Sequence, residues 1–107
     1  MNLRYTPSAI LDLEEMRDYI TEELQNPDAG QNMLKRIVRD LSALKAQPHL
    51  GQTLRRKFGL DMDGCCIISG RQLAVYDINE EEDMVEILRV LDTRTDYLRV
   101  LLSSDTQ

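Results

Sequence analysis

The sequence has no tryptophan, one phenylalanine, one histidine and only two cysteines among its 107 residues. Cys65 and Cys66 are adjacent, and neighbouring side chains on a strand point to opposite faces, so we expect no disulfide between them. With no CxxC or Cys/His spacing, and His49 as the single imidazole, the sequence argues against a zinc site. No glycine-rich phosphate loop or other cofactor motif is present. The expected protein is therefore reduced and cytoplasmic, with no metal and no cofactor.

Long apolar runs are also missing. The longest spans only a few residues, far below the roughly 20 that a membrane helix needs, and the opening segment MNLRYTPSAI has no apolar stretch behind a charged start. We therefore expect neither a membrane span nor a secretory signal. With 42% hydrophobic and 30% charged residues, the chain fits one globular domain over residues 1–107.

The formal charge of −6 argues against a general nucleic-acid binder, because such domains are normally basic. The charge is unevenly distributed, however. Residues 31–57 contain seven basic side chains and one acidic one, a net of +6, whereas residues 1–30 and 58–107 have nets of −5 and −7. This asymmetry predicts one strongly positive surface on an acidic protein, suited to an anionic partner.

The first half of the sequence predicts a strand followed by two helices. Leu3 and Tyr5 alternate with polar residues, which indicates a short strand with one buried face. Apolar residues then recur at three- and four-residue steps, which predicts a helix over residues 8–25 that Ser8 caps. A second apolar stripe follows a capping-box pattern at Asp28 and Gln31. The short connection predicts an antiparallel helical hairpin.

Pro48 and Gly51 end the second helix, after which the pattern changes to a period of two. Residues 52–64 are interpreted as a basic loop or an irregular strand, and residues 93–102 as a short helix or extended arm. The predicted strands of this half are Cys65–Ser69, Gln72–Ile78 and Met84–Leu91. The predicted fold is α+β, in the order β-α-α-β-β-β, with a small antiparallel-dominated sheet packed on the helical hairpin.

No local catalytic motif is present, so the candidate functional residues are mainly basic. Arg55, Arg56 and Lys57 stand side by side, and consecutive cations are tolerated only in solvent or opposite anions. They are interpreted as contacts for phosphates or for acidic groups of a partner, with a solvated loop as the alternative.

Arg89 interrupts an apolar strand, and a half-buried guanidinium must find a carboxylate or several acceptors. Asp77 and Glu86 are the partners that the nearby sequence offers. A structural ion pair is the favoured interpretation, with a role in target or partner binding as the alternative.

Arg94 follows the end of this strand, where a rigid sheet often displays functional groups. With Tyr76, Tyr97 and Arg99 it could form a site in which rings stack on bases and guanidiniums hold phosphate. The alternative is that Arg94 is an ordinary solvated surface residue.

The order of these segments resembles the RelE/ParE superfamily of bacterial toxins over nearly all of residues 2–102. The segments that support the resemblance are YTPSAILDLEEMRDYITEEL, NPDAGQNMLKRIVRDLSAL, Pro48-His49-Leu50-Gly51 and LAVYDINEEEDMVEILRVLDTRTDYLRVLL. The resemblance implies the toxin of a type II toxin–antitoxin pair, neutralised in a hetero-oligomer by an antitoxin whose C-terminal segment wraps over it. RelE-like members cut messenger RNA on the ribosome without a metal, using Arg, Lys and Tyr side chains. ParE-like members poison DNA gyrase and do not use those residues.

The sequence departs from the pattern of the RelE-like ribonucleases at the positions of their catalytic residues. The middle strands have Cys65, Cys66 and two isoleucines where RelE-like members place basic residues. An ungapped alignment sets Thr95 opposite their catalytic arginine, and a one-residue shift sets Arg94 there, with Tyr97 near their tyrosine. Metal-free RNA cleavage needs a base, an acid and cations together, so these losses count against it.

The favoured hypothesis is accordingly a toxin that acts on a protein target such as gyrase. The alternative is a ribosome-dependent endoribonuclease that uses Arg94 and Tyr97, and a further alternative is a non-toxic binding module on the same fold. Target or partner contacts are assigned to Arg55, Arg56, Lys57, Tyr76, Arg89 and Arg99.

Overall fold

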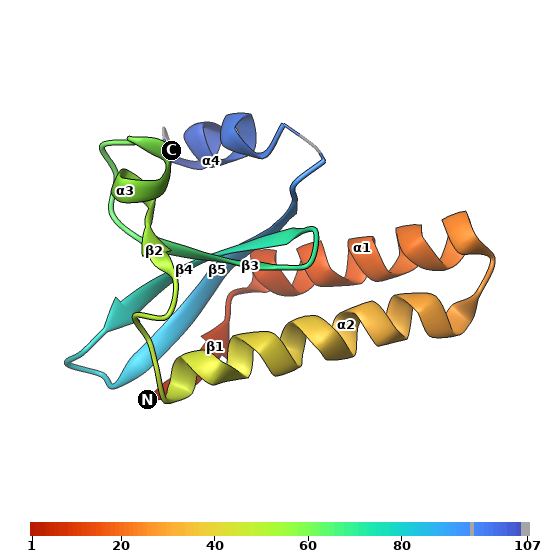
Figure 1. Cartoon of the computed structure of the whole chain (residues 1–107), viewed down its shortest axis with the longest axis horizontal. Helices are drawn as coiled ribbons and strands as arrows, with labels where there is room; N and C mark the ends of the chain where they lie inside the picture. Colours follow the sequence, from red (N-terminus) through yellow and green to blue (C-terminus); the bar gives the residue numbers. More distant parts are fainter. Residues whose placement is uncertain (95, 106–107) are drawn as a thin grey trace.

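A helical hairpin packs on one face of a five-stranded sheet in the computed structural model of the chain (Figure 1). The structure describes residues 1–94 and 96–105, with Tyr97 and residues 103–105 described by their backbone alone. The elements are β1 (Asn2–Tyr5), α1 (Pro7–Leu24), α2 (Pro27–Ser42), the 3-10 helix η1 (Ala43–Lys45), β2 (Gln52–Thr53), α3 (Leu54–Phe58), β3 (Cys65–Ser69), β4 (Gln72–Asn79), β5 (Met84–Asp92) and α4 (Tyr97–Asp105). No helix within the described ranges is long and apolar enough to cross a membrane.

The strands lie in the order β1-β5-β4-β3-β2. The first and last long strands, β1 and β5, are parallel neighbours, and every other pair is antiparallel. The predicted α+β class and element order are therefore confirmed, in a mixed sheet with one parallel pair. Residues 52–64, for which a loop and an irregular strand were both open, form the two-residue strand β2, the short helix α3 and a loop.

Both long helices begin earlier than the sequence pattern suggested, and each is capped by a different residue. Thr6, rather than Ser8, caps α1, because its hydroxyl accepts a hydrogen bond from the Ala9 amide at 3.1 Å. Asn26, rather than Asp28, caps α2 through its side-chain oxygen, which accepts from the Asp28 amide at 3.0 Å. A proline follows each cap, where its fixed φ suits the first helical turn and its missing N–H costs nothing.

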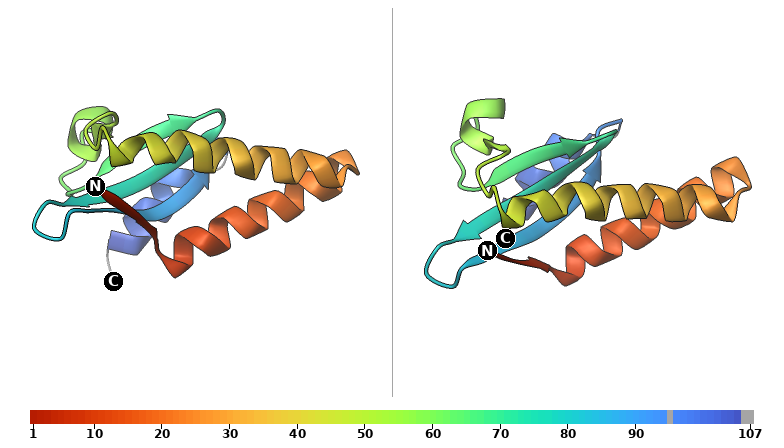
Figure 2. Two further views of the ribbon diagram at one scale, coloured as in Figure 1. Left: turned by 90° about the horizontal axis from the view of Figure 1, so that it is seen from below. Right: turned by 60° about the horizontal axis from the view of Figure 1, so that its bottom comes forward.

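The sheet is covered on both faces, so the central strand β4 is buried along most of its length (Figure 2). One core lies between the hairpin and the sheet and includes Leu13, Ile37 and Tyr76. The second core lies on the opposite face, where α3 and α4 pack on residues such as Val75 and Leu91. The sequence predicted only the first of these two layers.

The adjacent cysteines confirm the strand alternation. Cys65 packs against the first core and Cys66 belongs to the second, and both are free thiols. Burial raises the pKa of each thiol, so neither resembles an activated nucleophile, which needs a lowered pKa.

A β-bulge interrupts the pairing of β4 with β5. Val75 faces Arg89 and Tyr76 faces Ile87, which leaves Leu88 as the extra residue of β5. As a result Ile87 and Val90, three positions apart, both pack in the hairpin-side core. A bulge changes the facing of the residues that follow it, so Arg89 lies opposite Val75 of the second core instead of continuing the alternation of Val85 and Ile87.

Candidate functional site

A groove separates the outer half of the helical hairpin from the ends of the strands. It consists of two adjoining cavities of about 600 and 630 Å³, and Tyr19, Ile20 and Arg94 line both. The first cavity continues toward Asp12 and the end of β5, and the second toward α2 and the β3–β4 turn. The groove exists because the hairpin projects beyond the sheet, so the end of α1 has no strand beneath it (Figures 1 and 2).

The walls of the groove are mainly apolar, and some of the apolar side chains that form them are exposed to solvent. Met16, Ile20 and Met33 form the inner surface, while Tyr19 and Leu24 on α1 are 57% and 62% exposed. Isolated exposed apolar residues are common on proteins, but these two line the same concave surface. The groove therefore fits an amphipathic partner better than a small polar substrate.

Arg94 lies at the junction of the two cavities and is fixed by Asp92. Its Nε and Nη2 donate to the two Asp92 oxygens at 3.1 and 2.9 Å, and its amide donates to Oδ1 at 2.8 Å. The hydrogen bond from the Arg94 side chain lowers the pKa of Asp92, and the same bond raises the pKa of Arg94. The sequence thus placed Arg94 correctly at a rigid strand end, and the structure shows its charge matched by Asp92.

Arg89 does form an ion pair, but with a different partner from those the sequence offered. Its Nε and Nη2 donate to Asp12 on α1 at 2.7 and 3.0 Å, and the Val90 amide donates to the same carboxylate at 3.0 Å. The expected partners Asp77 and Glu86 instead face each other across β4 and β5. The physical reason is tertiary packing, because α1 lies against β5 and places Asp12 beside Arg89 and the Val90 amide.

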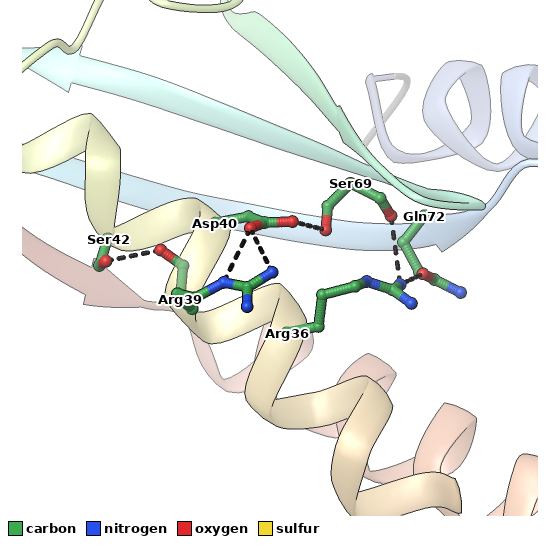
Figure 3. A network of polar contacts seen from close by, with 6 residues as sticks. All are labelled: Arg36, Arg39, Asp40, Ser42, Ser69 and Gln72. Carbon is green, nitrogen blue, oxygen red and sulfur yellow. Dashed lines mark hydrogen bonds and ion pairs between the residues drawn. The ribbon is translucent and has the colours of Figure 1, made fainter.

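Arg36 on α2 borders the second cavity and takes part in a polar network with the β3–β4 turn (Figure 3). Its Nη2 donates to the Ser69 carbonyl at 3.4 Å and to the Gln72 side-chain oxygen. The Ser69 hydroxyl donates to Asp40 at 2.6 Å, and this hydrogen bond is the main reason that the pKa of Asp40 is lowered. The network joins α2 to the end of the sheet and shapes the floor of the groove.

Tyr76 is not available for stacking. It is fully buried in the hairpin-side core, and its hydroxyl donates to the Pro48 carbonyl and accepts from the Gly51 amide, at 2.9 and 3.2 Å. The expectation of a ligand contact at Tyr76 is therefore wrong. The residue instead ties the loop before β2 to the core.

The remaining candidates lie away from the groove. Arg55, Arg56 and Lys57 are exposed on α3, across the sheet from the hairpin, and Arg55 pairs with Asp61 at 3.3 Å. Arg99 is exposed on α4, which packs on the same face as α3. The structure therefore divides the predicted site between two faces of the sheet. Thr95 and the Tyr97 side chain lie outside the described residues.

Sequence reasoning missed Asp12, Tyr19 and Arg36 as parts of the site. Tyr19 had a usable signal, because it is an aromatic residue off the apolar stripe of its helix. Asp12 and Arg36 had none, since their roles depend on strands far away in the chain.

The groove offers binding surfaces rather than reactive groups. Within residues 1–94 and 96–105, no group of three or more His, Cys, Asp or Glu side chains is arranged to hold a metal ion. Arg94 in the groove and Arg89 next to it are each paired with a carboxylate, Asp92 and Asp12 respectively. The arrangement suits recognition of another chain.

Comparison with solved structures places the fold in a known class. The chain superposes on a structure titled as the chromosomal ParDE toxin–antitoxin system of P. aeruginosa with a TM-score of 0.70 and 18% identity, covering 86% of this chain and 95% of that one. It superposes on the RelBE2 toxin–antitoxin complex of Mycobacterium tuberculosis with a TM-score of 0.61 and 25% identity, covering 85% and 88%. No curated protein sequence matches the chain. The fold is that of RelE/ParE-like toxins.

A family model identifies the chain more specifically than the fold does. The profile of the ParE toxin of the type II toxin–antitoxin system parDE matches residues 3–97. Because the match covers most of the chain, the protein belongs to the ParE toxin family. It is a type II toxin of the RelE/ParE superfamily, as the sequence resemblance implied.

Proposed function

We propose that the protein inhibits growth by binding a protein target such as DNA gyrase, and that a cognate antitoxin neutralises it. The family match supports a ParE-like rather than a RelE-like activity. The observation that carries the proposal is that, among the described residues, the side chains that were candidates for metal-free RNA cleavage do not converge on one surface.

Three of the candidate residues illustrate this separation. Tyr76 is fully buried, Arg89 is bound by Asp12, and Arg94 is bound by Asp92. Cleavage requires cations and proton donors or acceptors around one phosphate, whereas the basic residues of α3 lie across the sheet from the groove. Strand β3 adds no charge, because its residues Cys65–Ser69 include no ionised side chain.

The antitoxin has a suitable surface in the groove. An amphipathic helix places its apolar face in a hydrophobic groove through residues spaced three and four apart. Tyr19, Ile20, Leu24 and Met33 form an apolar surface of this kind. We assign this groove to the antitoxin, so the target-binding surface is sought elsewhere on the domain.

The test is expression of the chain without its antitoxin, together with a purified supercoiling assay. We expect arrested growth, a DNA-damage response and loss of gyrase supercoiling, with messenger RNA intact. Arg94→Ala is the matched variant, because Arg94 is exposed and bonds only Asp92, two residues away, among the described residues. This variant should fold normally and keep its effect on gyrase.

Two results would overturn the proposal. Messages cleaved at the ribosome by the wild-type chain, but not by Arg94→Ala, would establish the ribonuclease alternative. Normal growth at high expression, with supercoiling unaffected, would leave only a non-toxic binding module.

A further inference from the structure

Arg36 is a half-buried cation that forms no direct ion pair within the described residues. It is the only arginine of α2 that lines the groove, and among the described residues no carboxylate lies within 4.0 Å of its guanidinium. Asp40, one helical turn further on, accepts instead from the Ser69 hydroxyl and pairs with Arg39 at 3.3 Å. Asp40 therefore acts on Arg36 only as a charge at longer range, and a partly desolvated cation without a direct partner is costly.

The Arg36 guanidinium is held firmly in place on the floor of the cavity (Figure 3). Its Nη2 binds Ser69 and Gln72, and its planar group lies against Gly70, where a Cβ atom would be 2.8 Å from Nη2 and 2.9 Å from Cζ. Its Nε is buried with no hydrogen-bond partner, and Nη1 makes no hydrogen bond within the described residues. A fixed guanidinium with an unused donor is well suited to bind a carboxylate.

The charges around Arg36 also favour the binding of a carboxylate. Arg71, in the turn next to Gly70, lines the same cavity and forms no ion pair within the described residues. Arg94 also lines it, but its charge is matched by Asp92. Glu23 is the one acidic side chain among the lining residues of this cavity. The α2 end of the groove is therefore positive, while its walls are apolar.

We propose that this end of the groove is a carboxylate-binding subsite, at which Arg36, assisted by Arg71, binds an Asp or Glu side chain of the antitoxin's amphipathic segment. The inference rests on the proposed function, because it assumes that the antitoxin occupies the groove. A carboxylate on a protein segment fits better than a free anion, since Tyr19, Ile20 and Met33 beside the cations provide contact area for neighbouring apolar side chains.

The experiment measures the affinity of the purified full-length chain for the protein encoded by the reading frame beside the toxin gene, used as the antitoxin probe. Arg36→Gln should weaken binding about 10- to 150-fold, the range expected when a charge-assisted hydrogen bond of about 1.5–3 kcal/mol is lost. Arg39→Gln is the matched control, because it removes an arginine from the same helix whose side chain is 74% exposed and outside the groove. It should leave the affinity within twofold.

A mutant cycle then identifies the carboxylate. Each Asp and Glu of the probe is changed to the amide and tested against wild type and Arg36→Gln. One acidic residue should lose affinity against wild type and show little further loss against Arg36→Gln, whereas strict additivity at every position would overturn the proposal. If Arg36→Gln fails to fold, Arg71→Gln takes its place, since Arg71 has no side-chain hydrogen bond within the described residues. It should weaken binding by a smaller factor and reduce its salt dependence.

The failure of the inference differs from the failure of the proposed function. If the probe binds wild type and Arg36→Gln equally well, the proposal of a carboxylate subsite is wrong. The assignment of the groove to the antitoxin would then rest on its apolar contacts alone. If the probe does not bind the wild-type chain, the antitoxin assignment fails and the subsite fails with it.

Discussion

Replacing Asp12 with alanine is expected to destabilise the domain more than any other single change on the surface of α1. Asp12 accepts three hydrogen bonds, from Arg89 Nε, Arg89 Nη2 and the Val90 amide. The Asp12 side chain is 13% exposed and that of Arg89 is 28% exposed. The substitution therefore leaves a partly buried guanidinium and a backbone N–H without their acceptor.

The size of the effect follows from this geometry. Breaking a fully buried ion pair costs about 3–5 kcal/mol, and the remaining exposure of Arg89 allows some rehydration, so we expect about 2–3 kcal/mol. A domain of this size has a total stability of roughly 5–15 kcal/mol. The midpoint of thermal unfolding should fall by roughly 10 °C, at about 4 °C per kcal/mol for a chain of about 100 residues.

Urea unfolding measures the loss, with Asp18→Ala as the control. Asp18 lies on the same helix, is 65% exposed and pairs only with its neighbour Arg17, so both variants change helix propensity equally. The control should shift stability by about 0.5 kcal/mol or less. Equal losses in the two variants would refute the reasoning, as would additive effects of Asp12→Ala and Arg89→Ala in a double-mutant cycle.

Three further predictions concern the core, the turn and acid titration. Tyr76→Phe removes a buried hydroxyl with two hydrogen-bond partners, so urea unfolding should show a loss of about 1–3 kcal/mol; an unchanged midpoint would contradict its role as a tie. Gly70→Ala should lower the free energy of unfolding by about 1–2 kcal/mol in the same assay, because a residue with a side chain is strained at positive φ. Gly70 has φ +60°, and the Cβ of the introduced alanine would press on Arg36. Partial burial, and next the carboxylate of Glu86, raise the pKa of Asp77. The stability that its protonated form contributes is present at acid pH and is lost as pH rises through the raised pKa. Asp77→Asn should therefore raise the urea midpoint at pH 7 but not at pH 3, and a loss at pH 7 would show that the charge is stabilising.

The two long helices and the main strands could be predicted because local periodicity reports burial. The apolar stripes of α1 and α2 face one core, and the alternation of β3 separates Cys65 from Cys66 as expected. The helix starts could not be fixed in the same way, because Thr6 and Ser8 are both acceptable caps and only the backbone at Thr6 is extended.

The candidate site was predictable only in part. Arg94 follows directly from its place after a buried strand. The burial of Tyr76 could not be predicted, because a buried and an exposed tyrosine look alike in a strand pattern. Alternation separates the two faces of the strand but does not say which face the hairpin covers. The partner of Arg89 required knowledge of how α1 packs against β5, which puts a residue 77 positions earlier in the chain within hydrogen-bond distance.

The sequence by itself determined the class of fold and the resemblance to RelE/ParE toxins, because these depend on patterns within short stretches of chain. The tertiary structure decided which charges meet: Asp12 pairs with Arg89 and Asp92 with Arg94, whereas Arg36 forms no direct ion pair among the described residues. It also created the groove, whose lining residues come from α1, α2, the β3–β4 turn and the end of β5. Electrostatic partners and concave surfaces are set by distances between remote segments, and no local pattern encodes those distances.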